Sequence, residues 1–271
     1  MDNKINKQKF IEYVSGFNLK DDRIVMKREH SIKTADVAKK IAKQLFYGDE
    51  ELIELCYAIG LLHDIGRFYQ WQTYQTFNDL ESVDHGDYGS KILFESVDDN
   101  NLIKSFAIEE KWYGYLFLAI KFHNKLKIDE SFVKNYCTDM SMDESLAISL
   151  CKLARDADKV DISRVVTEGK SKFSVPKRVD LSLTGYSSEI MSAIKNKHSC
   201  DFQFRRTALD YALSSFAYIY DFYYDISKKL FLKYMDKFIQ ILLDAYKNIL
   251  NSEDYSTLQW VCEEAKKNFA K

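Results

Sequence analysis

The stretch LLHDIGRF, residues 61–68, places a histidine and an aspartate side by side at the end of an apolar run. The segment before it begins with acidic residues at positions 49–51, which suit a helix N-terminus, and continues with apolar residues at helical spacing. Gly66 predicts the end of this helix. We therefore expect His63 and Asp64 at its last turn, where both side chains can reach the same ion or two neighbouring ions.

Helical patterning extends over nearly the whole chain. Nine glycines and one proline in 271 residues are too few for the turns of a sandwich or a barrel. Apolar residues recur at spacings of three and four in many further segments, and no alternating strand pattern competes with them. The sequence therefore predicts an all-α fold. The further predicted helices cover residues 32–46, 86–95, 112–122, 128–136, 143–163, 189–195, 202–224, 227–250 and 254–269.

One compositional break interrupts this pattern at residues 167–186, which hold the single proline and two of the nine glycines. We use it to divide the chain into residues 1–165, a helical core, and residues 166–271, a helical C-terminal extension. The aromatic-rich helices of the extension need a partner surface, so we expect them to pack on the core and form one domain with it.

Composition and charge exclude several classes of protein. The formal net charge of -2 gives no reason to expect capture of bulk nucleic acid or of an anionic membrane. The first residues show no secretory signal, and the longest apolar run, 112–120, is too short to span a bilayer. The five scattered cysteines form no Cys-x-x-Cys pair, as expected of reduced thiols. We expect a cytoplasmic protein with no membrane partner, and the oligomeric state stays open.

Four further motifs accompany the His-Asp pair of LLHDIGRF. They are His30 in KREHSIKTADVA, His85 in DHGDYGSKIL, His123 in IKFHNK and Asp158 in ARDADKVD. Together these motifs resemble the HD-domain superfamily of metal-dependent phosphohydrolases, in its version with four histidines and two aspartates. The resemblance covers roughly residues 24 to 165 and implies an HD-domain-like helical bundle.

The resemblance implies a divalent metal site. Two ions about 3.5–4 Å apart can clamp phosphoryl oxygens, supply a deprotonated water and help the leaving oxygen. In this hypothesis His85 and His123 hold the second ion, the other four residues hold the first, and Asp64 bridges the two. Nitrogen and oxygen donors together favour iron, manganese, cobalt, nickel or zinc over magnesium or calcium. The six implied ligands are His30, His63, Asp64, His85, His123 and Asp158.

Basic residues near these motifs are candidates for contact with substrate phosphate. Arg67 follows the doublet by three positions, where related HD proteins often present a cation to phosphate, so we place it with Asp64 in the catalytic site. Lys159 is the third catalytic candidate. It and Arg155, which lies one turn before Asp158, either reach the same cleft or pair with neighbouring aspartates.

Residues next to the first and third motifs have two interpretations each. Lys27 and Arg28 precede the first histidine and could also bind phosphate, although basic residues at a helix start are usually only solvated. Asp84 and Asp87 flank His85, where a carboxylate could carry a proton or orient a ligand histidine. We prefer the simpler interpretation, in which Asp84 caps the helix and Asp87 lies in its first turn.

These observations predict a metal-dependent phosphohydrolase that acts on a small phosphorylated substrate, a nucleotide or a small phosphodiester. The subgroup that cleaves cyclic dinucleotides is disfavoured, because Asn124 follows His123 where that subgroup has a second histidine, and no Gly-Tyr-Pro tripeptide occurs. Two alternatives stay open. The same ligand set holds a di-iron centre in HD-type oxygenases, and a regulatory HD module could keep the metals for structure alone.

Overall fold

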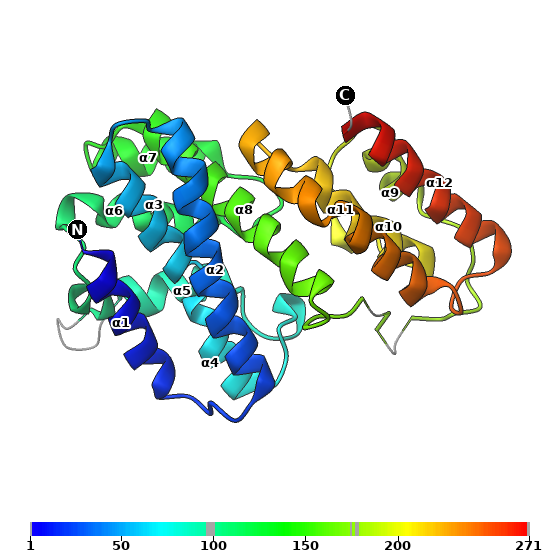
Figure 1. Cartoon of the computed structure of the whole chain (residues 1–271), viewed down its shortest axis with the longest axis horizontal. Coiled ribbons are helices and arrows are strands. Elements are labelled where there is room, and N and C mark those ends of the chain that lie inside the picture. The colour runs from blue at the N-terminus through cyan, green and yellow to red at the C-terminus, as the bar shows by residue number, and fades with distance from the viewer. Residues whose placement is uncertain (1, 96–100, 174, 177–178, 270–271) are drawn as a thin grey trace. The chain divides into compact units, whose positions relative to one another are not determined.

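The computed structural model describes residues 2–95, 101–173, 175–176 and 179–269. Within these ranges every regular element is an α-helix or a short 3-10 turn, and no strand is present (Figure 1). The prediction of an all-α fold is confirmed. The chain divides into two compact units, Met1–Asp161 and Ile162–Lys271. Packing of the C-terminal extension on the core stays a prediction.

The first unit holds the motifs that resemble the HD family. An aspartate side chain at the residue before a helix accepts backbone N–H groups at several of its helix starts, as Asp49 does for α3. Asp84 caps α5 in the same way, which confirms its simpler interpretation. The helices are α1 (Asn3–Ser15), α2 (Asp22–Leu45), α3 (Glu50–Leu62), α4 (Ile65–Tyr74), α5 (His85–Phe94), α6 (Tyr113–Phe122), α7 (Glu130–Asp139) and α8 (Glu144–Thr167), with 3-10 turns η1 (Asp79–Glu81), η2 (Leu102–Ser105) and η3 (Glu110–Trp112). Helix α8 continues into the second unit.

Two glycines let helices of this unit meet backbone to backbone. A Cβ atom on Gly60 would lie 2.8 Å from the Thr34 carbonyl oxygen, so α3 lies directly against α2 at this point. A Cβ atom on Gly66 would lie 2.6 Å from the carbonyl oxygen of His85 and 2.8 Å from the nitrogen of Gly89, so α4 touches α5. These close contacts bring together α2, α3, α4 and α5, which carry or adjoin motif residues.

The predicted effect of Gly66 was wrong. Helix α3 already ends at Leu62, and Gly66 lies in the first turn of α4, a helix that the sequence pattern did not reveal. The break falls at Asp64, whose backbone angles of φ -101 and ψ 17 are not helical. Gly66 is required for the contact between α4 and α5, and not for the end of α3.

The second unit contains a further departure from prediction. In place of one helix over 202–224, it has η4 (Phe202–Phe204), α10 (Ala208–Ala217) and η5 (Tyr218–Tyr220). Helix α10 starts anew at Thr207, because the Thr207 hydroxyl and the Asp210 carboxylate form a reciprocal capping box. A local polar signal therefore overrides the continuous apolar pattern at this point.

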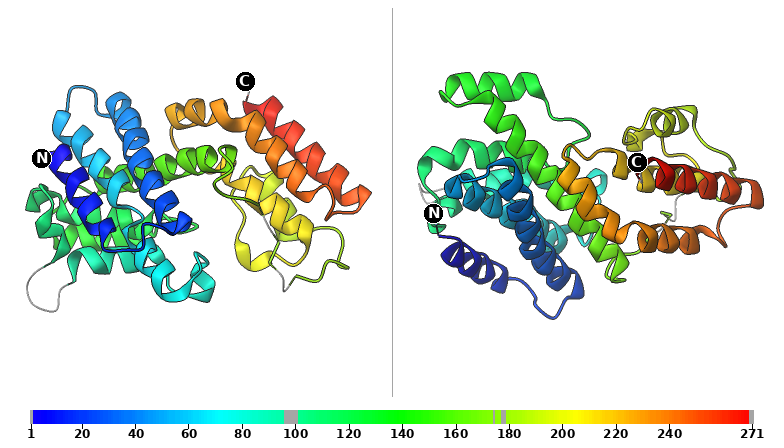
Figure 2. Two further views of the ribbon diagram at one scale, coloured as in Figure 1. Left: turned by 60° about the horizontal axis from the view of Figure 1, so that its bottom comes forward. Right: turned by 45° about the horizontal axis from the view of Figure 1, so that its top comes forward.

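The remaining helices of the second unit are α9 (Ser188–Lys195), α11 (Asp225–Tyr246) and α12 (Ser252–Phe269). Helices α11 and α12 run side by side in opposite directions (Figures 1 and 2). Its core contains the large buried side chains Phe216, Phe231, Phe238 and Tyr246. All five cysteines of the chain are free and buried. In the described ranges no helix has both the length and the apolar character that a bilayer crossing requires.

Candidate metal centre

The six side chains singled out by the motifs lie in one cluster within the first unit. His30 comes from the body of α2 and Asp158 from α8. The other four stand at helix ends. His63 follows the last residue of α3, Asp64 precedes α4, His85 begins α5 and His123 follows α6. The imidazoles and Asp64 are at most 4% exposed, and the Asp158 side chain is 17% exposed.

One half of the cluster contains two imidazoles and a carboxylate. The Nε2 atoms of His30 and His63 are 3.3 Å apart. Asp158 Oδ1 lies 3.0 Å from His30 Nε2 and 3.5 Å from His63 Nε2. Three donor atoms of types that transition metals prefer thus converge from α2, α3 and α8.

The other half contains the remaining imidazoles. The Nε2 atoms of His85 and His123 are 3.0 Å apart. Each ring is held by its other nitrogen. Nδ1 of His85 donates to Asp79 Oδ2 at 2.6 Å, and Nδ1 of His123 donates to the carbonyl oxygen of Ile120 at 2.6 Å. In the neutral rings, both Nε2 atoms therefore face each other with lone pairs.

Asp64 joins the two halves. Its Oδ2 lies 3.5 Å from the Nε2 atoms of both His30 and His63. Its Oδ1 lies 3.4 Å from His85 Nε2 and 3.6 Å from His123 Nε2. Each carboxylate oxygen thus faces its own pair of imidazoles, which is the arrangement expected of a carboxylate shared by two neighbouring ions.

The donor set fits divalent cations. Around His85 and His123, the two Nε2 atoms and an Asp64 oxygen face one another within 3.6 Å, and in the neutral rings both Nε2 atoms are acceptors. Buried acceptors that converge in this way are costly unless a cation lies among them. Two groups of three, His30 with His63 and Asp158, and His63 with Asp64 and His123, each keep their ligand atoms within 4.8 Å. The residues present therefore suit a divalent metal.

The imidazoles of the first half are oriented in the same manner. Nδ1 of His63 donates to the carbonyl oxygen of Gly60 at 2.7 Å, and Nδ1 of His30 donates to Asp161 Oδ2 at 2.7 Å. In each half, therefore, the Nδ1 of one ring donates to a backbone carbonyl, and the Nδ1 of the other ring donates to a carboxylate. Such partners fix the ring and increase the basicity of the ligating nitrogen.

Electrostatics differ between the two halves. Burial and the neighbouring Lys27 disfavour a charged His30, but hydrogen bonds to Asp158 and Asp161 outweigh them and raise its pKa to about 9. Burial, assisted by Arg67, lowers the pKa of His85 to about 3. Burial alone would raise the pKa of Asp64, yet Lys27 and the imidazoles hold it well below its usual range. Asp64 is therefore ionised, and its negative charge attracts Lys27 and the imidazoles around it.

Arg67 lies beside Asp64, with its guanidinium held by several acceptors. Its Nε is 3.5 Å from Asp64 Oδ1, and its Nη1 donates to Asp79 at 2.8 Å and to Gln70 at 2.6 Å. The Nε atom is buried and makes no hydrogen bond within the described part of the chain. Arg67 therefore reaches the centre, and its contact with phosphate stays a prediction.

The two basic candidates on α8 have different surroundings. Arg155 is buried, and it donates to the carbonyl oxygens of Phe122 and Leu126 at 3.2 Å each. These hydrogen bonds fix the backbone before and after His123, so Arg155 has a structural role. Lys159 follows Asp158 on α8 and is half-buried, and its catalytic role stays a prediction.

Sequence reasoning gave too little weight to two residues. Lys27, for which both phosphate binding and simple solvation were open, places its Nζ 2.6 Å from Asp64 Oδ2 with only 14% of its side chain exposed. It lies one helical turn before His30 on the same face of α2, and this spacing could have indicated it. Asp79, in the turn η1, contacts both Arg67 and His85 and has no motif around it.

In its described residues the first unit is helical, and four imidazoles and Asp158 surround Asp64 inside it. These features are those of helical proteins with a buried metal-binding centre. The sequence model of the HD domain matches residues 28–163, which is half of the chain. The chain belongs to the HD-domain family. HD domains are typical of metal-dependent phosphohydrolases. Neither the curated proteins nor the solved structures gave a significant match.

Proposed function

We propose that the chain is a metal-dependent phosphohydrolase that hydrolyses a small phosphate ester, a nucleotide or a small phosphodiester, at the six-residue centre. The observation that carries this proposal is the position of Asp64, whose two oxygens face two separate imidazole pairs. Divalent ions bound there would lower the pKa of a water molecule and polarise the phosphoryl oxygens.

The chain itself supplies order and positive charge around this chemistry. The Nδ1 partners hold all four rings with Nε2 turned inward, so the donor atoms need little reorganisation. Lys27 and Arg67 flank the two oxygens of Asp64, at 2.6 and 3.5 Å. Both cations lie over the Phe77 ring, at 5.4 and 5.6 Å from its centroid. They form a basic edge on which phosphate oxygens can bind.

A small ester suits this chain better than a nucleic-acid polymer. Polymers are bound through many phosphate contacts, which need an excess of basic residues. The chain has 39 Lys and Arg against 41 Asp and Glu. Two cations at the centre are enough for one or two phosphate groups, so a nucleotide or a small phosphodiester is the proposed class of substrate.

The test is phosphate release from a panel of nucleotides and small phosphodiesters. Metal-stripped protein is supplied in turn with manganese, iron, cobalt, nickel, zinc or magnesium. Asp64→Ala is compared with Asp36→Ala, which removes a half-exposed carboxylate from the surface of α2. We expect metal-dependent release in the wild-type protein and in Asp36→Ala, and none in Asp64→Ala.

Two other results would overturn the proposal. Oxygen consumption with an iron EPR signal, without phosphate release, would indicate the oxygenase alternative. Silence over the whole panel, in protein that binds metal and loses thermal stability when it is removed, would indicate a regulatory module with structural metals.

A further inference from the structure

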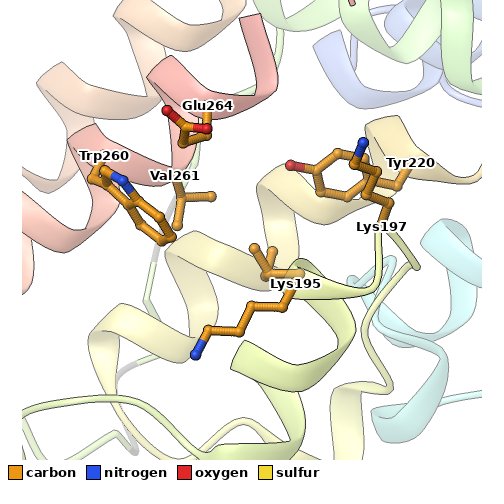
Figure 3. Close-up of a pocket in the computed structure, with 7 residues that line it drawn as sticks. Lys195, Lys197, Tyr220, Trp260, Val261 and Glu264 are labelled. Atoms are coloured by element: carbon orange, nitrogen blue, oxygen red, sulfur yellow. The ribbon is translucent and has the colours of Figure 1, made fainter. Parts of the chain in front are cut away.

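A pocket in the second unit plays no part in the proposed hydrolysis. It has a volume of about 180 Å³ and lies between the C-terminal turn of α9, the turn η5 and the middle of α12. A cavity of about 150 Å³ is enough to admit benzene. The pocket therefore has room for one flat ring system. Lys195, Lys197, Tyr220, Trp260, Val261 and Glu264 line it (Figure 3).

The pocket offers surfaces on which a ring can lie. Ile194 and Val261 are buried and form its apolar base. Trp260 is 50% exposed, so half of this large indole is open to a ligand. Figure 3 shows Tyr220 on the side opposite Trp260. Burial raises the pKa of Tyr220 to about 12, so its hydroxyl stays protonated and can donate a hydrogen bond. Exposed indole faces are typical platforms for flat heterocycles.

The charged groups around the pocket favour a ligand with both an acid and N–H donors. Lys195 and Lys197 are exposed on the α9 side. Glu264 faces them from α12, and its charge is partly balanced by Lys267, whose Nζ is 2.8 Å away. The lysines suit an anionic group, and the carboxylate suits a ring edge that donates N–H bonds.

Lys197 lines the pocket from the end of α9. Lys197 has a φ angle of 56, in the left-handed region. It ends α9 with its N–H donating to the Ile194 carbonyl, while the next N–H donates to the Ala193 carbonyl. Glycine is the ordinary residue at this position of a helix end. These two hydrogen bonds are the usual closure of a helix end, and they place Lys197 at the lining of the pocket.

We propose that this pocket binds a purine nucleoside monophosphate. The base lies against Trp260 above Val261, its N–H edge faces Glu264, and the phosphate contacts Lys195 or Lys197. A flat ring, adjacent N–H donors and an acid group occur together in such nucleotides, and guanine presents two neighbouring donors. This site goes beyond the proposed hydrolase function and does not rest on it.

The test uses the full chain labelled with 5-fluorotryptophan. The chain has three tryptophans, which give three fluorine resonances. Trp71 contacts Phe77 beside the metal centre, with ring centroids 4.9 Å apart and the rings tilted, and so reports binding there. Trp112, hydrogen-bonded to Glu51, is the internal control. We expect GMP to shift the Trp260 resonance saturably, and to do so in Asp64→Ala as well.

Three variants sharpen this test. Lys195→Gln and Lys197→Gly each remove one lysine charge from the pocket. We expect GMP affinity to fall about tenfold in at least one of the two variants, and in both if both lysines contact the phosphate. Lys197→Gly also relieves the left-handed backbone, so its melting temperature should not fall. Lys237→Gln, on the exposed surface of α11, should leave the affinity unchanged.

Several outcomes would overturn the proposal. They are a Trp260 resonance unmoved by millimolar GMP, equal shifts with guanosine or ribose 5-phosphate, or unchanged affinity in both lysine variants. A shift of Trp71 alone would place GMP at the metal centre only.

Discussion

Gly66→Ala should damage the centre through a single methyl group placed against backbone. The new Cβ would lie 2.6 Å from the carbonyl oxygen of His85 and 2.8 Å from the nitrogen of Gly89, whereas ordinary contacts begin at 3.4 Å. No side chain can rotate to relieve this overlap. Helix α5 must therefore retreat from α4 by about 0.8 Å.

The retreat acts directly on a proposed ligand, because His85 is the first residue of α5 and provides the clashing oxygen. Functional groups need to be held within about 0.5 Å of their working positions. Overpacking costs about 1–3 kcal/mol, and the better helix propensity of alanine returns up to about 1 kcal/mol. With the full return, we expect a net destabilisation of up to about 2 kcal/mol, with weaker binding of one of two ions.

Gly89→Ala is the matched control. Its Cβ would meet the Gly66 nitrogen at 3.3 Å and two isoleucine methyl groups at 3.4 and 3.5 Å, so it lies at the same contact with little overlap. The assay is metal content after equilibrium dialysis, together with the melting temperature. Equal metal content and equal stability in the two variants would refute the argument that the α4–α5 contact positions His85.

Three further predictions follow from the same contacts. Asp79→Asn and Asp161→Asn each weaken the carboxylate support of one imidazole, so each should lower metal affinity about 10–100-fold in titration calorimetry, for one ion and not the other; equal loss of both ions would contradict this. Lys27→Met removes a cation 2.6 Å from Asp64, so metal should bind more tightly while kcat/KM for phosphate esters falls, whereas Lys33→Met on the exposed side of α2 should change neither. Chelation should lower the melting temperature of the wild-type protein more than that of Asp64→Ala, because the variant binds less metal in its folded state.

The fold class and the gathering of the six residues could be predicted from the sequence. Helical spacing and scarce turn residues identify an all-α chain, and each motif places its residue on or beside a helix. The resemblance to HD proteins supplied the grouping around Asp64, which spacing alone cannot give. In the structure the Asp64 carboxylate lies between two imidazole pairs, as the hypothesis of a shared Asp64 expects.

What the sequence could not reveal depends on contacts between distant segments. Gly66 reads locally as a helix stop, but its absent side chain serves the contact with α5. Asp79 lies in a short 3-10 turn without periodicity, so nothing in the chain indicates that it supports His85. Lys27 resembles any solvated lysine until α4 brings Asp64 beside it. Tertiary placement decides the role of each of these residues.

The most direct test of the central claim is the rate of phosphate release measured against the number of metal ions bound per chain. We predict that metal-free protein is inactive, that turnover rises as ions bind up to about two equivalents, and that Asp64→Ala neither binds the full complement nor turns over. Turnover that is independent of bound metal, or that survives in a folded Asp64→Ala protein, would contradict it.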